Sequence, residues 1–452
     1  MHGLYGTFND DSGTLCGHDA GGSRLCRILY SCNDMLSSYS IRNILCAASL
    51  LISISLSARV KPGVEVLVER GFAGLEGKRV GLVTNPSGVD SQLRSTIDIL
   101  YDAPQVELVA LYAPEHGVRG DIYAGGKVES GKDERTGLPV HSLYGSTRQP
   151  TKAMLEGIDI MIYDIQDVGS RSYTFISTLG LVMRTCAEMD IPVMVLDRPN
   201  PLGGLKIEGP VVEDGFHSFV SQYKIPYIYG LTVGELAMLI NEEGLNRGQN
   251  GREAVVKCEL LVVPMEGWTR DMLFNDTGLP WVLPSPNIPY PESAICYPSS
   301  GMIGEMYNYL NIGIGYTLPF ATFAEEWVDA DKLKARLDSY EIPGVAWRTI
   351  HYKPISGRLA GKLIQGVQYY YTDFEAATLT LTQYYVMQAV WELYGKNPFQ
   401  TSQERLPMFN KVCGTDFVSK TFGRTLNVSD IKDFWYKDVE AFRKLSKKYH
   451  IY

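Results

Sequence analysis

A carboxylic acid beside a histidine is the first chemical feature of the chain. Residues 114–117 have the sequence Pro-Glu-His-Gly and follow an apolar segment directly. A carboxyl group with apolar surroundings, as at the end of a buried strand, can have a raised pKa, which suits a general acid. Glu115 is therefore a candidate proton donor, and His116 a candidate contact to a substrate. A solvated turn in which the glutamate caps a helix explains the same residues equally well.

The segment 164–173 gathers carboxylates, an amide, a guanidinium and a phenol in one short stretch. These side chains belong to Asp164, Gln166, Asp167, Arg171 and Tyr173. Such a mixture suits the recognition of hydroxyl and amide groups on a sugar. An aspartate–arginine pair that braces a loop is the structural alternative.

Two further polar groups have simpler structural interpretations. The loop 197–201 is stiffened by prolines, which favours a rigid turn, and its polar members are Asp197, Arg198 and Asn200. Glu235 follows Thr232 by three residues, which is the spacing of a helix capping box. Contact with a sugar is the alternative for the loop, and catalysis is the alternative for Glu235.

Paired carboxylates perform glycoside hydrolysis. One carboxyl group protonates the leaving oxygen, and the other activates water or acts as the nucleophile. With Glu115 as the acid, the candidates for the second role are Asp164, Asp167 and Glu235. Trp281 and Asn287 would add an aromatic wall and a polar contact to such a site.

Other chemistries lack their motifs in this sequence. The glycines at 71, 74 and 77 precede a predicted strand, whereas a dinucleotide-binding fingerprint follows one. The sequence contains no Walker loop, no His-Glu-x-x-His and no Gly-x-Ser-x-Gly elbow. Cys186, Cys258, Cys296 and Cys413 form no Cys-x-x-Cys pair, so we expect buried small hydrophobic residues and no zinc site. No metal or organic cofactor is implied.

Alternating apolar and helix-like segments predict the scaffold of the first half. Strands are expected at 79–84, 106–113, 158–164, 193–197 and 260–263, with a helix at 173–189. Continuous Val/Ile/Leu strands separated by helices indicate an α/β fold with a parallel sheet. Ligands bind at the carboxyl ends of such strands. The polar clusters at 85–88, 114–117, 164–167 and 197–200 should therefore meet at one edge.

The second half has a different pattern. Prolines concentrate at 280–300, which predicts an extended connection into another domain. Beyond it, 321–340 and 375–394 are helix-like and 363–371 is strand-like. The final forty residues are amphipathic and helix-like.

Composition and the N-terminal segment bear on partners and location. The 452 residues carry 42 Lys+Arg and 51 Asp+Glu, for a net charge of −9, so there is no basic surplus for nucleic acid or an anionic membrane. Residues 1–58 resemble a leader, in which 35–58 has the charge, apolar run and small residues of a signal peptide. We expect a start at Met35, export to the periplasm or beyond, and no membrane span after processing. A genuine extension with an anchor helix is the alternative.

Eight short strings, in fixed order, resemble one family. They lie at 85–88, 113–117, 142–145, 164–174, 196–201, 208–210, 230–237 and 284–287. Together they are similar to the family first described as domain of unknown function 1343 and later as exo-β-N-acetylmuramidases of the NamZ type. The resemblance covers about residues 62–395.

The resemblance implies a Rossmann-like domain over 59–283 and a smaller α/β (α+β) auxiliary domain over 284–452, with the active site in a cleft between them. It implies an exo-acting glycoside hydrolase that releases N-acetylmuramic acid from the non-reducing end of peptidoglycan fragments. The family's functional glutamate falls on Glu115. Glu305 corresponds to a glutamate that the family shows in a Glu-Gly-Thr-Asn string, and we expect it to contact the substrate.

One position departs from the family pattern. Ile314 stands where the family usually has an arginine between two glycines. An arginine there would be a natural partner for the lactyl carboxylate of muramic acid, so a related amino sugar is an alternative substrate. A non-catalytic relative that binds muropeptides and an esterase or amidase of the cell wall are the alternative functions.

Overall fold

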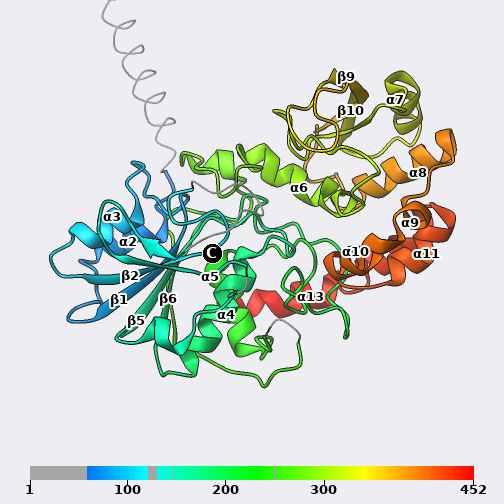
Figure 1. Ribbon diagram of the computed structural model, residues 1–452. Helices are drawn as coiled ribbons and strands as arrows, with labels where there is room; N and C mark the ends of the chain where they lie inside the picture. The colour runs from blue at the N-terminus through cyan, green and yellow to red at the C-terminus, as the bar shows by residue number, and fades with distance from the viewer. Residues whose placement is uncertain (1–58, 121–129, 146, 249–250) are drawn as a thin grey trace, which may run out of the picture. The chain divides into compact units, whose positions relative to one another are not determined.

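A seven-stranded, mostly parallel sheet forms the first half of the chain in the computed structural model (Figure 1). The structure describes residues 59–120, 130–145, 147–248 and 251–452, so the predicted leader and signal peptide lie outside the described residues. The strands, in sheet order, are β3 (Gly131–Lys132), β4 (Pro139–Ser142), β2 (Glu107–Ala113), β1 (Arg79–Thr84), β5 (Ile160–Asp164), β6 (Val193–Leu196) and β7 (Leu260–Val263).

The strand order is that of a Rossmann-like sheet. Only the short β3 pairs antiparallel, with β4. Without β3, the strands across the sheet are the third, second, first, fourth, fifth and sixth along the chain. The order reverses between β1 and β5, which is the topological switch point of the sheet. The inner strands β5 and β6 are wholly buried, as their continuous apolar runs predict. The predicted α/β fold is confirmed.

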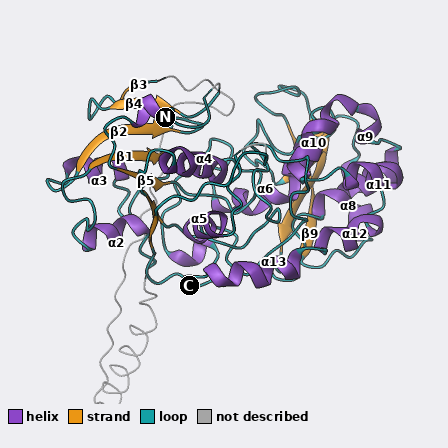
Figure 2. Ribbon diagram, turned by 90° about the horizontal axis from the view of Figure 1, so that it is seen from below, coloured by secondary structure: helices purple, strands orange, loops and turns teal. Residues whose placement is uncertain are grey.

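Helices cover both faces of this sheet (Figure 2). Val80 and Leu82 of β1 pack with α2 (Gly63–Glu69) and α3 (Thr96–Asp102), whereas Val83 packs with α4 (Phe175–Ala187) and α5 (Val233–Glu242). The alternation follows from the two-residue period of a strand. The capping box predicted at the start of α5 is present, with both of its hydrogen bonds.

A smaller antiparallel sheet and a set of helices form the second half. The sheet order is β8 (Thr322–Glu325), β10 (Ile364–Tyr371), β9 (Val345–Tyr352). The helices are α6 (Pro291–Gly304), α7 (Ala330–Asp338), α8 (Thr382–Tyr394), α9 (Pro398–Thr401), α10 (Leu406–Cys413), α11 (Phe417–Thr425), α12 (Ser429–Tyr436) and α13 (Val439–Ser446), with short 3₁₀ turns η3 (Gln403–Arg405) and η4 (Lys447–Tyr449). Two further 3₁₀ turns, η1 (Lys152–Leu155) and η2 (Phe274–Thr277), belong to the first half.

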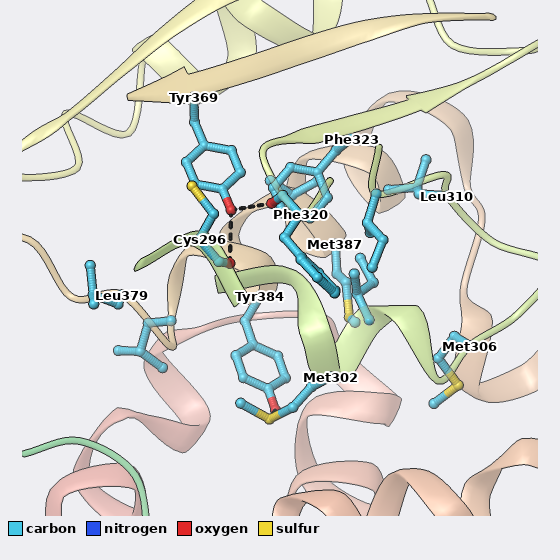
Figure 3. Close-up of a cluster of buried hydrophobic side chains, with 14 of the residues drawn as sticks. Cys296, Met302, Met306, Leu310, Phe320, Phe323, Tyr369, Leu379, Tyr384 and Met387 are labelled. Carbon is cyan, nitrogen blue, oxygen red and sulfur yellow. Dashed lines mark hydrogen bonds between the residues drawn. The ribbon is translucent and has the colours of Figure 1, made fainter. Parts of the chain in front are cut away.

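The apolar core of the second half joins its sheet to α6 and α8. Figure 3 shows the hydroxyl of Tyr369, on β10, donating to the backbone oxygens of Cys296 on α6 and of Phe320, at 3.1 and 2.5 Å. This buried donor is satisfied by two carbonyl groups, so the tyrosine fixes α6 against the sheet. All four cysteines of the described chain are free and buried, which confirms their predicted character.

Three predictions for the second half are corrected. The proline-rich stretch is not extended throughout, because α6 begins at Pro291 and contains Pro298. Proline at the first helical position loses no needed hydrogen bond, which is why a proline can begin this helix. The helix predicted at 321–340 is strand β8 followed by α7, and α8 begins at Thr382, seven residues later than predicted.

The end of the chain returns to the first half. Val439 and Phe442 of α13 belong to the apolar cluster of α4 and α5. The Tyr452 hydroxyl donates to Asp197 at 2.8 Å, and the Ile451 amide donates to Glu235 at 2.9 Å. Within the described ranges, no helix is long and apolar enough to cross a membrane.

Candidate active site

A cavity of about 370 Å³ lies beside the carboxyl end of β2 and against α6. Its volume is in the range of small-molecule sites. It is lined by Glu115, His116, Ser172, Tyr173, Thr174, Phe175, Ser285, Asn287, Ile288, Tyr297, Gly301, Gly304, Glu305, Ile312 and Phe320. The structure therefore brings together five residues that the sequence singled out: Glu115, His116, Tyr173, Asn287 and Glu305.

A tight turn after β2 carries Glu115 into the cavity. The Gly117 amide donates to the Pro114 carbonyl at 3.2 Å, which closes the turn. His116 has a φ of 77°, a left-handed conformation that costs a non-glycine residue on the order of 1–3 kcal/mol. His116 is also buried, so packing holds this strained backbone in place. Strain of this kind is common at functional sites.

Tyr144 is a neighbour of Glu115 that the sequence analysis did not select. Its hydroxyl forms a hydrogen bond with Glu115, and burial together with the charge of that carboxylate raises the pKa of Tyr144 to about 12. The phenol therefore stays protonated and acts as a donor. The family string at 142–145 contained this residue and was the available signal.

Aromatic rings form a wall of the cavity. Tyr173 packs edge-on against Phe175 and Tyr297, with ring centroids 5.1 and 5.6 Å apart. Tyr297 in turn packs edge-on against Phe320 at 5.0 Å. Such a row of rings presents flat apolar surface to the carbon–hydrogen face of a sugar, and edge-to-face packing fixes the rings in place.

Asp164, a predicted catalytic residue, lies outside the cavity lining. It is fully buried at the end of β5, where Arg198 binds both of its oxygens, at 2.5 and 2.8 Å. The Thr96 hydroxyl also donates to it at 2.5 Å. An aspartate–arginine pair therefore braces this loop, and these contacts favour a structural role for both Asp164 and Arg198.

Glu235, the other predicted catalytic partner, is likewise engaged in structure. It is fully buried, completes the capping box of α5, and accepts two hydrogen bonds from Arg270 at 2.7 and 3.0 Å. It does not line the cavity with Glu115. The capping interpretation is the one that these contacts favour.

The remaining polar loops also brace the fold. Asp197 accepts hydrogen bonds from Thr232 and the Gly234 amide, and burial raises its pKa to about 6. Gln166 donates to the Pro199 carbonyl at 2.7 Å, and Asn200 donates to the Leu231 carbonyl at 2.9 Å. Against the sugar contacts predicted for Gln166, Asp197, Arg198 and Asn200, none of the four lines the cavity.

Arg171 links the two halves of the chain. It is fully buried and donates to the carbonyls of Pro210, Ile225, Val412 and Cys413 and to the Ser221 hydroxyl. Burial lowers its pKa to about 10. Its hydrogen bonds reach α10, and it does not line the cavity, so these contacts favour a structural role over the predicted substrate contact.

Asp167 does not line the cavity but acts on two of its aromatic residues. It is buried, accepts hydrogen bonds from the Gly169 amide and the Tyr229 hydroxyl, and has a pKa that burial raises to about 6. Its charge acts on Tyr173 and Tyr297, both of which line the cavity. Asp167 is therefore near the site but is not part of the cavity lining.

Ile314 does not line the cavity either. It is half-buried between Gly313 and Gly315, both of which have positive φ, and it packs against the core of the second half. Among the residues that the structure describes, no group of three or more His, Cys, Asp or Glu side chains is arranged to hold a metal ion.

Two acidic side chains that face one aromatic-lined cavity meet the basic requirement of glycoside hydrolysis, and a glycoside hydrolase is the class of protein that the fold and the site define. Two family models match the chain, described as the N-terminal and C-terminal parts of exo-β-N-acetylmuramidase NamZ, over residues 80–292 and 295–452. The chain belongs to this family.

Individual relatives agree with this assignment. The chain is 42% identical over 394 residues to the peptidoglycan β-N-acetylmuramidase NamZ of Bacillus subtilis, covering 87% of this chain and 92% of that protein. Two crystal structures of DUF1343 family proteins from Bacteroides fragilis are similar. One has a TM-score of 0.82 at 52% identity and the other 0.68 at 28%, each covering 87% of this chain and 99% of theirs.

Proposed function

We propose that this chain is an exo-acting glycoside hydrolase that releases N-acetylmuramic acid from the non-reducing end of peptidoglycan fragments. The observation that carries the proposal is the cavity in which Glu115 faces an aromatic wall. The name of the 42% identical relative, a peptidoglycan β-N-acetylmuramidase, supports the choice of substrate.

Glu115 is the general acid of the proposed reaction. As the bond between the anomeric carbon and the leaving oxygen breaks, the carboxylic acid gives its proton to that oxygen. The hydrogen bond with Tyr144 orients the Glu115 carboxyl group. The buried turn at His116 fixes the backbone from which it projects.

The terminal sugar occupies the cavity, against the aromatic wall. Tyr173 and Tyr297 pack against the ring, and Asn287 supplies an amide for its polar groups. Ile314 lies outside the cavity lining, two residues from Ile312, which is part of it.

Export of the chain and a role in cell-wall recycling are part of the proposal. Residues 35–58 carry a positive charge, a short apolar run and small residues at a possible cleavage point, which is the pattern of a signal peptide. A substrate outside the cytoplasm requires such a location, in the periplasm or beyond.

The proposal is tested on the disaccharide of N-acetylmuramic acid β-linked to N-acetylglucosamine. The purified chain should release free N-acetylmuramic acid, detected by mass spectrometry. Glu115→Gln should lower the rate on the order of 10²–10⁴-fold, because the amide has no proton of suitable acidity to give. Glu107→Gln is the matched control, since Glu107 begins the same strand and is exposed.

Each alternative function predicts a different result. Binding of the disaccharide without any product would indicate a non-catalytic relative, and loss of an acyl group in place of a sugar would indicate an esterase or amidase. Equal rates for Glu115→Gln and the unaltered chain would refute the role of Glu115.

A further inference from the structure

Glycoside hydrolysis by a pair of carboxylates needs a second acidic group beside Glu115. The predicted candidates Asp164 and Glu235 are held in buried ion pairs, and Asp167 is bonded to Tyr229 and does not line the cavity. Among the described residues that line the cavity, the acidic ones are Glu115 and Glu305. We propose that Glu305 is the second catalytic carboxylate and that Arg405 is the residue that positions it. This inference rests on the proposed function.

Glu305 is brought to the cavity by the end of α6. It follows the last residue of the helix, and its amide donates to the Met302 carbonyl at 3.2 Å. Gly301 and Gly304, in the same final turn, also line the cavity. Gly304 lets Ile312, another lining residue, pack closely against this turn, since a Cβ at Gly304 would lie 2.9 Å from the Ile312 side chain.

Tyr297 connects the two carboxylates in space. It lies on α6, lines the cavity, and its phenol is acted on by the charges of both Glu305 and Glu115. Its hydroxyl is hydrogen-bonded to that of Ser172 at 3.0 Å, which holds the ring in place. A sugar packed against Tyr297 therefore lies within reach of both acidic groups.

Arg405 holds Glu305 at two points. Its Nε donates to the Glu305 backbone oxygen at 2.9 Å, and its Nη2 donates to Oε2 of the carboxylate at 3.0 Å. The guanidinium also lies over the ring of Tyr307, 5.6 Å from its centroid. A planar guanidinium fixed in this way sets the direction of the carboxylate more closely than a lysine would.

The charge of Arg405 also favours the ionised form of Glu305. Burial raises the pKa of Glu305, and Arg405 opposes that rise. Burial and, in turn, the charge of Glu305 raise the pKa of two neutral groups, Tyr297 on the same helix and Cys413 on α10. A nucleophile or a base must be ionised, so Arg405 keeps Glu305 ready for either role.

The proposed hydrolysis breaks one bond of the anomeric carbon and forms another. The bond between the anomeric carbon and the leaving oxygen breaks, and the leaving oxygen takes the proton of Glu115. The anomeric carbon forms its new bond with an oxygen on the opposite face. That oxygen comes either from a water whose proton passes to Glu305, which releases the sugar directly, or from Glu305 itself. In the second case a water gives a proton to Glu115 and attacks the anomeric carbon, the bond to Glu305 breaks, and the free sugar and both carboxyl groups are restored.

The first test compares Glu305→Gln with Glu292→Gln. The glutamine can still accept from Arg405, so the fold is preserved while the charge is lost. We expect kcat to fall on the order of 10²–10⁴-fold with little change in KM. Glu292, in the first turn of α6 and bonded to Asn275 at the surface, is the matched control and should leave the rate unchanged.

Chemical rescue provides a readout that a structural role would not produce. In Glu305→Ala, added azide should raise the rate at least tenfold and yield the α-azide of N-acetylmuramic acid, because azide takes the vacated position opposite the leaving group. Arg405→Gln should move the acidic limb of the kcat/KM profile to higher pH, and Arg405→Lys should restore part of that shift.

Failure of this inference is distinct from failure of the proposed function. If the unaltered chain releases no N-acetylmuramic acid, the proposed function fails. If it releases the sugar but Glu305→Gln changes only KM, or azide neither accelerates Glu305→Ala nor appears in a product, the assignment of Glu305 is overturned.

Discussion

Glu115 and Asp164 stand at the ends of the two strands that flank β1, yet Glu115 alone of the pair lines the cavity. A turn carries Glu115 two residues past β2, whereas Asp164 is the last residue of β5 and is bound by Arg198 and Thr96. The sequence placed both carboxylates at one sheet edge correctly. The sequence could not show that Arg198, 34 positions along the chain, would pair with Asp164.

Asp164→Asn should therefore affect stability more than catalysis. Breaking a buried ion pair leaves Arg198 without its counter-charge and costs about 3–5 kcal/mol. The free energy of unfolding from urea titration measures this loss, and turnover per folded molecule should change less than about twofold. A large loss of turnover with unaltered stability would instead return Asp164 to catalysis.

Asp167 should make stability depend on pH. Burial raises its folded pKa from 3.8 to about 6, so the folded chain holds this proton more tightly than the unfolded chain does. The stabilisation is complete below pH 4 and is lost as pH rises through about 6.

Asp167→Asn removes this titration. We compare the unfolding free energy of the variant minus that of the unaltered chain at two pH values. This difference should be larger at pH 7 than at pH 4, on the order of 1–3 kcal/mol. Asp331→Asn, at an exposed position on α7, is the control and should show no such difference. Equal pH dependence for Asp167→Asn and the unaltered chain would refute the raised pKa.

At the scale of elements, the strands of the first half could be predicted because a short, continuous apolar run has few alternatives to a buried strand. The second half was harder, since β8 is only four residues long and α6 contains a proline that normally argues against a helix. Strand β9 shows a partial alternation of buried and exposed residues that was missed. The catalytic proposal for Glu305 depends on α6, so it could not be reached from the sequence.

The capping box of α5 is an element whose contribution can be measured. Thr232 accepts from the Glu235 amide at 3.2 Å and donates to Asp197 at 2.7 Å. Thr232→Ala should lower the free energy of unfolding by about 0.5–2 kcal/mol through the lost cap. Thr232→Ser keeps the hydroxyl and should lose much less; an equal loss for both variants would show that the methyl group matters more than the cap.

At the scale of the whole molecule, long-range contacts unite the two halves. Arg171 binds carbonyls on α10, and Tyr452 binds Asp197 beside the first sheet. The two family models meet between residues 292 and 295, close to the boundary predicted at 283/284, which remains a prediction. The cavity takes residues from both sides of that boundary, so neither half alone holds Glu115 and Glu305.

The central claim is the removal of a single N-acetylmuramic acid from the non-reducing end, and a defined tetrasaccharide tests it most directly. The substrate alternates N-acetylmuramic acid and N-acetylglucosamine and begins, at its non-reducing end, with N-acetylmuramic acid. Products of the unaltered chain are followed over time by mass spectrometry. The account predicts one free N-acetylmuramic acid per molecule and a stable trisaccharide that begins with N-acetylglucosamine. Release of disaccharides, or of N-acetylglucosamine, would contradict it.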